Sequence, residues 1–222
     1  MGRQAALAAA YAVGFAAVTA ALAAGTPLID LDLAVRAWSE AHRPPGAEAV
    51  ARALNRFGQG GALAATCLAL AGWVALRIRR WWPPLYVIVA AALIGMSVLP
   101  VKYLTERAAP SSALPPEQGV PLLATLPPGE YDTSYPAGHV VNSVVWYGVG
   151  LLLVTALVRA REPARPWRPP PWLWAVARVG PVALLLATTT YLSFHWLTDG
   201  LAGLCLGLLI DRALWLTARM LV

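Results

Sequence analysis

The sequence predicts an all-α polytopic membrane protein with six transmembrane helices, and three observations support this fold class. Of its 222 residues, 59% are hydrophobic and only 13% are charged, a balance that is not typical of a soluble domain of this size. Six stretches have few or no charges and are roughly 20 residues long, the length that a helix needs to cross a bilayer. All six are predicted as helices, because lipid offers no water to an open strand edge.

The six spans are predicted to form one transmembrane domain that takes in residues 1–222. The predicted spans are residues 4–24, 58–76, 83–101, 138–158, 173–194 and 196–216. The loop after the first span is expected to hold interfacial helices over about residues 30–57. Residues 103–137 are expected to form a long, proline-containing loop on the same side of the membrane.

The distribution of charge predicts that the N and C termini lie in the cytoplasm. An even number of spans places both termini on one side, and that side holds most of the arginines but only two acids, Glu162 and Asp211. The opposite side holds five arginines and one lysine against nine acids. Basic residues collect on the cytoplasmic side of membrane proteins. We therefore expect a multi-pass protein of the plasma or bacterial inner membrane, and no nucleic-acid partner despite the net charge of +6.

Two short amphipathic patterns occupy the first outside loop. In the first, Leu31, Val35 and Trp38 share one face, while Asp32 and Arg36 share another. Each pattern is too short and too polar to cross a bilayer, which favours helices that lie on the membrane surface.

The second pattern carries two arginines with two possible roles. Glu48, Arg52 and Arg56 share its polar side. One interpretation is a solvated face on an interfacial helix, and the other is that Arg52 or Arg56 reaches an anionic ligand.

Four ionisable residues are predicted to meet at the outer ends of the spans. Lys102 follows the third span, His139 opens the fourth, and His195 and Asp199 flank the junction of the fifth and sixth. Each has a plain alternative: a lysine can extend to the headgroups, an aspartate can cap a helix, and a histidine can lie at a wet boundary. Their convergence on one face, with His195 and Asp199 four residues apart, favours a functional site.

Together these residues could transfer a phosphoryl group. A carboxylate beside a histidine fixes its tautomer, so that the other ring nitrogen can attack an electrophile. A second histidine can protonate the leaving group. Gly138 precedes a helix, whose first backbone N–H groups can bind an anion.

Two sequence motifs around these residues resemble those of the type 2 phosphatidic acid phosphatase family, a group of membrane lipid phosphatases. The family pattern of a lysine, six residues and Arg-Pro is similar to "KYLTERAAP", which has Lys102 and Pro110 but Ala109 in place of the arginine. The pattern Pro-Ser-Gly-His is similar to "PAGH", which has Ala137 in place of the serine.

The third motif of the family is Ser-Arg, five residues, a histidine, three residues and an aspartate. The stretch "TTTYLSFHWLTD" supplies His195 and Asp199, with Thr188 and Thr189 in place of Ser-Arg. The resemblance covers about residues 50–212, and both motif arginines are absent.

The resemblance implies specific roles for these residues. His195 would be the nucleophile, Asp199 its orienting partner and His139 the general acid, with no metal and no cofactor. Lys102 and the backbone of Ala137 and Gly138 would hold the phosphate.

Other residues would have to replace the absent arginines. Arg107, two positions before Ala109, is the expected substitute, and Arg52 and Arg56 are further candidates. The hydroxyl groups of Thr188 and Thr189 could donate further hydrogen bonds. Each charge-assisted contact is worth about 1.5–3 kcal/mol, so an active enzyme needs replacements.

The resulting function is hydrolysis of a lipid phosphomonoester or diphosphate, from a membrane phospholipid or a polyprenyl phosphate, through a phosphohistidine. The alternative is a catalytically weak family member that binds a phospholipid without turnover. A metal site of two histidines and a carboxylate is disfavoured because Lys102 and Arg107 would repel a cation. A transporter is disfavoured because transport sites usually lie near the midplane. The sequence does not determine the oligomeric state.

Overall fold

The fold was analysed in a computed structural model that describes residues 2–124, 126–129, 133–161 and 170–221. The long helices are α1 (Gly2–Ala23), α4 (Gly60–Ile78), α5 (Trp82–Thr105), α7 (Gly138–Arg161), α8 (Pro171–Tyr191) and α9 (Leu197–Leu221). The short elements are α2 (Leu28–Ala41), α3 (Pro45–Asn55), the 3-10 turn η1 (Arg56–Gly58) and α6 (Pro116–Gly119). No strand occurs within these ranges, which confirms the all-α prediction.

Six of the helices are long and apolar enough to cross a membrane, as predicted. They are Gly2–Ala23, Gly60–Ile78, Trp82–Thr105, Gly138–Ala160, Pro171–Tyr191 and Leu197–Thr217. The main difference lies in α5, which continues to Thr105 beyond the predicted end at residue 101. Lys102 therefore lies in the last turn of α5 rather than in the loop that follows it.

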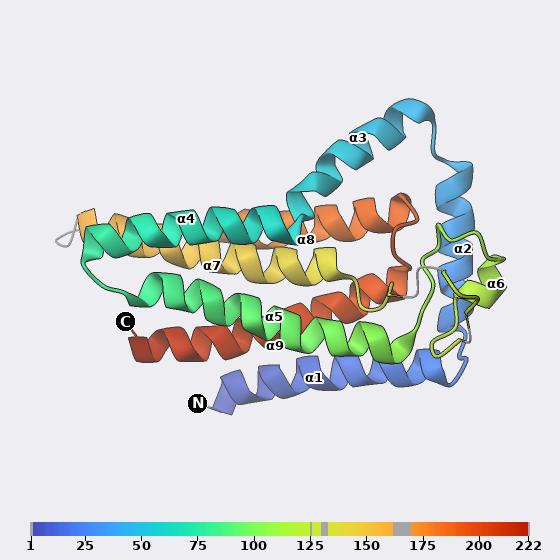
Figure 1. The fold of residues 1–222 in the computed structure, drawn as a ribbon, viewed down its shortest axis with the longest axis horizontal. Helices are drawn as coiled ribbons and strands as arrows, with labels where there is room; N and C mark the ends of the chain where they lie inside the picture. The colour runs from blue at the N-terminus through green and yellow to red at the C-terminus, as the bar shows by residue number, and fades with distance from the viewer. Residues whose placement is uncertain (1, 125, 130–132, 162–169, 222) are drawn as a thin grey trace.

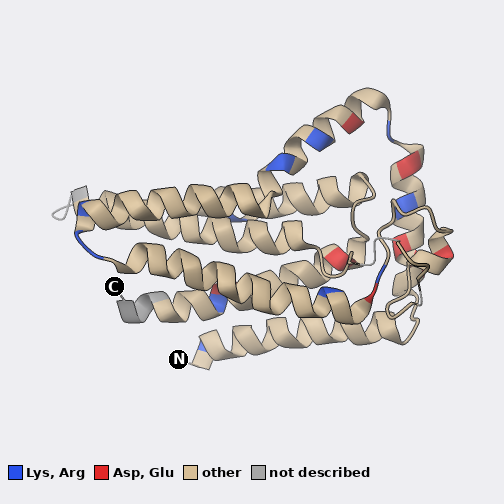
Figure 2. Ribbon diagram, in the orientation of Figure 1, with Lys and Arg blue, Asp and Glu red and all other residues tan. Residues whose placement is uncertain are grey.

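The six long helices lie side by side along one direction, and α2 lies across one end of the bundle (Figure 1). Both termini lie at the other end, as an even number of spans requires. Acidic residues gather around α2 and α6, while the turn between α4 and α5 is basic (Figure 2). The assignment of the basic end to the cytoplasm stays a prediction.

Helix α7 runs through the centre of the bundle. In the most apolar 18-residue stretch of α7, 56% is buried inside the protein, whereas the corresponding share in α1 is 6%. Gly207 of α9 allows close approach to α7, since an added Cβ would lie 3.0 Å from Val144 Cβ. Gly203 lies against the turn that precedes α7, where an added Cβ would lie 2.7 Å from the carbonyl oxygen of Ala137. Because these two glycines have no side chain, α9 can pack closely against α7 and its preceding turn.

Helix α2 is turned so that its polar side faces the bundle. Asp32 and Ser39 are buried, whereas Leu31 and Trp38 are 42% and 59% exposed. The two residues predicted to share a polar face have different surroundings, since Asp32 is only 1% exposed and Arg36 pairs with Glu40. The reason is electrostatic, because the end of the bundle offers Asp32 a buried arginine partner, described below.

The substitution Gly203→Ala is expected to destabilise the protein by about 1–3 kcal/mol, because the added methyl group would meet backbone atoms of Ala137. Thermal unfolding of the detergent-solubilised protein measures this. The matched control is Gly72→Ala in α4, where an added Cβ meets no atom within 4 Å. This substitution should stabilise the helix by up to about 1 kcal/mol. Equal melting temperatures for the two variants would contradict the prediction.

Candidate active site

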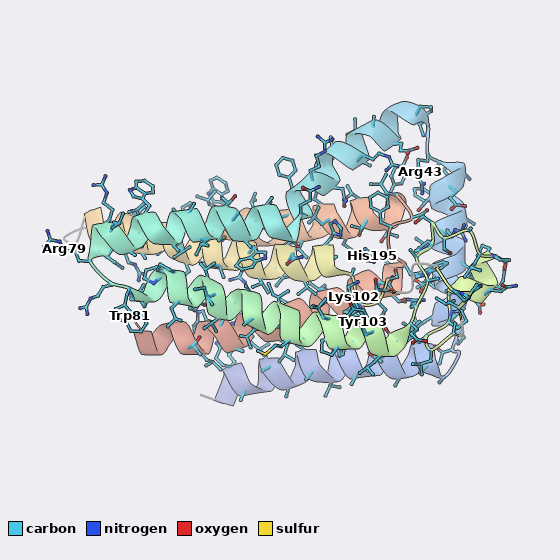
Figure 3. All side chains as sticks on the ribbon, in the orientation of Figure 1. Arg43, Arg79, Trp81, Lys102, Tyr103 and His195 are labelled. Carbon is cyan, nitrogen blue, oxygen red and sulfur yellow. The ribbon has the colours of Figure 1, made fainter. Side chains whose placement is uncertain are left out.

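The predicted site residues are brought together at the end of the bundle covered by α2. Lys102 and His195 both lie at this end, in α5 and in the loop between α8 and α9 (Figure 3). The rings of His139 and His195 pack edge to face, with their centroids 5.9 Å apart. Lys102 approaches the start of α7, because a Cβ added to Gly138 would lie 3.9 Å from its Cε atom.

The loop between α8 and α9 holds His195 through its backbone and through Trp196. The backbone N–H groups of Phe194 and His195 both donate to the carbonyl of Thr189, at 2.9 and 3.3 Å. Trp196 is 2% exposed, and its indole N–H donates to the carbonyl of Ala108 at 2.8 Å. These contacts fix the imidazole of His195 at the head of α9.

Asp199 both caps α9 and faces His195. Its Oδ2 atom accepts the backbone N–H of Trp196 at 3.0 Å, so the capping role considered from the sequence is present. The same oxygen lies 3.6 Å from His195 Nδ1, too long for a direct hydrogen bond. The helix cap therefore places a carboxylate beside the histidine.

Ser134 bridges Asp199 and His195. Its Oγ atom donates to Asp199 Oδ2 at 2.6 Å and lies 3.3 Å from His195 Nδ1. With its proton on the carboxylate side, Ser134 accepts Nδ1–H, which leaves Nε2 of His195 unprotonated and free to attack. Sequence analysis missed Ser134. The only signal was its position five residues before His139.

Arg107 is fully buried and bonded to two carboxylates. Its Nη1 atom donates to Asp199 Oδ1 at 2.5 Å, and its Nη2 atom donates to Asp32 Oδ2 at 2.7 Å. Further bonds join Nη1 to Thr198 Oγ1 at 2.8 Å and Nε to the carbonyl of Val120 at 2.7 Å. All three side-chain nitrogens of Arg107 thus donate into the protein.

Asp32 completes this buried cluster from α2. Its Oδ1 atom accepts the backbone N–H of Thr198 at 3.0 Å, and its Oδ2 atom accepts the hydroxyl of the same residue. Burial raises the pKa of the Asp32 carboxyl, against the opposing effect of the Arg107 guanidinium. Asp32 therefore ties α2 to the first turn of α9.

The placement of Arg107 differs from the expected phosphate contact. With 0% of its side chain exposed and every nitrogen engaged, Arg107 faces the back of Asp199 rather than a ligand. Its backbone also holds the site, since its carbonyl accepts the N–H of Ser134 at 3.0 Å. We therefore assign Arg107 a positioning role.

Thr188 and Thr189 also point away from a ligand. The hydroxyl of Thr189 donates to the carbonyl of Leu185 at 2.7 Å, and that of Thr188 lies 3.5 Å from Asn55 Oδ1. Both side chains are buried. Their hydroxyl groups support helix packing in this conformation rather than the predicted phosphate contacts.

The predicted backbone donors divide into two sets. The N–H of Ala137 donates to the carbonyl of Asp199 at 3.0 Å, so it is not directed at a ligand. Gly138 and His139 begin α7, where N–H groups have no acceptor within the helix. The Lys102 ammonium donates to the carbonyl of Thr133. The start of α7, with Lys102 beside it, is therefore the best-placed anion site among the predicted residues.

A pocket of about 290 Å³ opens in front of the two histidines. The described residues that line it are Ala109, Ser111, Ser112, His139, Phe194 and His195. This lining includes no lysine or arginine, but it includes the two hydroxyl groups of Ser111 and Ser112. Within the described ranges, no three histidine, cysteine or carboxylate side chains are grouped to hold a metal ion.

Comparison with known families decides the relationship. The model of the PAP2 superfamily matches residues 80–221, which include all four ionisable residues predicted to converge. The chain belongs to the PAP2 superfamily. This confirms the resemblance to type 2 phosphatidic acid phosphatases. No curated protein sequence matches the chain significantly.

A solved structure shows the same fold over the whole chain. The solved protein is a transmembrane PAP2 type phosphatidylglycerolphosphate phosphatase from Bacillus subtilis. Its sequence is 19% identical to this chain, and the two structures align with a TM-score of 0.72. The match covers 100% of this chain and 98% of that chain. The PAP2 fold therefore extends to α1–α4, which lie outside the region that the family model matches.

The substitution Arg107→Ala is expected to destabilise the protein by about 3–5 kcal/mol, because it leaves two buried carboxylates without their cation. Thermal unfolding in detergent measures the loss, and Arg107→Lys should recover part of it. Arg3→Ala serves as the control, since Arg3 is exposed at the other end of the bundle. If Arg107→Ala unfolded at the wild-type temperature, the cluster would not be structural.

Proposed function

We propose that this PAP2 protein is an integral membrane lipid phosphatase that works through a phosphohistidine. The observation that supports this most strongly is the pair of imidazoles, His139 and His195, which contact each other and line the same pocket. The carboxylate of Asp199 and the hydroxyl of Ser134 lie on the Nδ1 side of His195, away from the pocket. A histidine with its Nδ1 held in this way presents a nucleophilic Nε2.

The first half of the proposed reaction transfers the phosphoryl group to the protein. His195 Nε2 attacks phosphorus, a P–N bond forms, and the P–O bond to the lipid breaks. The protonated His139 gives its proton to the departing oxygen, which leaves as the lipid alcohol or, from a diphosphate, as the lipid monophosphate. His195 then carries a positive imidazolium ring, which Asp199 and Ser134 stabilise from the Nδ1 side.

The second half restores the enzyme. His139, now neutral, takes a proton from a water molecule, whose oxygen attacks phosphorus as the P–N bond breaks. Inorganic phosphate leaves, His195 returns to its neutral tautomer, and His139 is again protonated. The first turn of α7 and Lys102 would bind the phosphate oxygens during both steps.

The position of the pocket supports an amphiphilic substrate. The histidines lie at the start of α7 and just before α9, where the spans end, so a bound phosphate would rest at headgroup level while the lipid tails stay in the bilayer. A polyprenyl phosphate or diphosphate and a phosphatidate-like lipid meet this requirement. We propose that this end faces the outside of the plasma or inner membrane, with the basic end in the cytoplasm.

The second candidate function is binding of a phospholipid without turnover. It is favoured by one observation, which is that the pocket lining has no arginine in place of the two that the family pattern expects. The two functions differ in phosphate release, not in lipid binding.

Phosphate release is therefore expected from at least one of phosphatidate, phosphatidylglycerophosphate, a polyprenyl phosphate and a polyprenyl diphosphate. His195→Ala should abolish it, because no P–N bond can form, and His139→Ala should slow it by about 10²–10⁴-fold. Brief reaction with a radiolabelled lipid phosphate should label the wild-type chain with an acid-labile phosphate. Lipid binding without His195-dependent release would favour the second function.

We also expect turnover to be independent of metal. Proton transfer and nucleophilic attack are assigned entirely to side chains, and Lys102 near the pocket would repel a cation. Phosphate release should be unchanged after dialysis against EDTA and in its presence. A loss that added Zn²⁺ or Mg²⁺ restores would instead support the metal site considered from the sequence.

A further inference from the structure

Besides Lys102, the pocket needs a guanidinium that replaces the two absent motif arginines. Arg107 directs all of its nitrogens inward, and the Lys102 ammonium donates to the carbonyl of Thr133. The residues that line the pocket carry no basic side chain other than the two histidines. Among the residues that the structure describes from α5 to α9, none therefore offers a guanidinium to a phosphate dianion in this pocket.

Three arginines from α2, α3 and their connection lie against the loop that carries His195. Arg36 lies over the ring of Trp196, with its Cζ 5.9 Å from the ring centroid. Arg43 lies over Tyr191 at 5.5 Å and donates to Ser193 Oγ at 2.7 Å. The third, Arg52 of α3, lies over Phe194 at 5.5 Å. The segment outside the family match thus brings three arginines to the histidine loop, two of them paired with glutamates of the same segment.

Among these three, Arg52 has the geometry of a ligand-binding residue. Of the aromatic residues under these arginines, Phe194 lines the pocket, whereas Tyr191 and Trp196 do not. Phe194 directly precedes His195. Arg36 has only 16% of its side chain exposed and Arg43 is bonded to Ser193, whereas 55% of the Arg52 side chain is exposed. Arg52 therefore stands at the rim of the pocket with its guanidinium accessible.

The present partner of Arg52 is weakly held. Arg52 Nη2 lies 2.7 Å from Glu48 Oε1, one turn back on α3, and the Glu48 side chain is 35% exposed. An exposed pair four residues apart on a helix contributes little to stability. A phosphate dianion is a stronger acceptor than one exposed carboxylate and would displace it.

We propose that Arg52 of α3 binds the substrate phosphate and provides the guanidinium that Ala109 and Thr189 do not. The ring of Phe194 holds the guanidinium at the pocket rim, and Glu48 occupies it until an anion arrives. This proposal rests on the proposed phosphatase site, but phosphate binding tests it separately from turnover. Its ligand class is a phosphate or diphosphate group, on a lipid or free.

The test measures the affinity of the full-length, detergent-solubilised protein for radiolabelled inorganic phosphate, and the KM for phosphatidate. Arg52→Ala should weaken phosphate binding and raise KM by about 10- to 100-fold, the effect of one charge-assisted hydrogen bond. Arg52→Lys, which keeps charge but loses the planar fork, should fall between. Glu48→Gln should act oppositely and bind phosphate severalfold more tightly, because the competing carboxylate is removed.

The matched control is Arg77→Ala, because Arg77 is an exposed arginine that lies 5.9 Å from the ring of Trp73 in α4, at the opposite end of the bundle. It should bind phosphate as the wild type does. The proposal is overturned if the wild type binds no phosphate, if Arg52→Ala binds it unchanged, or if Arg77→Ala weakens it equally. An effect of Arg56→Ala without one of Arg52→Ala also overturns it.

The two proposals fail in different ways. If His195-dependent phosphate release occurs and Arg52→Ala changes neither affinity nor KM, the phosphatase stands and the Arg52 site is rejected. If no lipid releases phosphate but Arg52→Ala still weakens binding, the Arg52 site stands and the protein binds lipid phosphate without turnover.

Discussion

The buried guanidinium of Arg107 is the interaction on which the site depends. It joins Asp32 of α2 to Asp199 of α9, two segments that are far apart in the chain. Neither carboxylate could remain charged in this interior without it, because removing an ion from water costs several kcal/mol unless a partner compensates. Its own backbone also fixes Ser134, so a single residue orients both groups behind His195.

This cluster has one cation for two carboxylates. The Asp199 carboxylate lies on the Nδ1 side of His195, with its Oδ2 atom 3.6 Å away, where its negative charge favours a positive ring. A phosphorylated imidazole carries that positive charge, whereas the resting ring does not. The arrangement therefore stabilises the proposed intermediate more than the ground state, which is what a nucleophilic histidine requires.

The sequence predicted the spans well because each span is a local property. An apolar run of sufficient length identifies a helix without knowledge of its neighbours, and all six predicted spans correspond to observed helices. The role of Arg107 and the burial of Asp32 depended instead on which side chains meet across the bundle. Periodicity placed Asp32 on a polar face, but it could not tell that the polar face turns inward toward Arg107. Ser134 had no periodic or motif signal, since its role comes from a turn that only the fold defines.

The departures from the family pattern make sense once orientation and binding are separated. Orientation of His195 needs a cation behind the carboxylate, in the dry interior, and Arg107 already fulfils it. Binding needs a cation in front of the ring, where a ligand arrives from the membrane surface and the side chain must stay mobile. The second cation can come from another segment than the histidines, because Arg52 of α3 lies over Phe194, which lines the pocket. Under the two proposals made above, the nucleophile stays where the family pattern has it while a phosphate contact moves to α3.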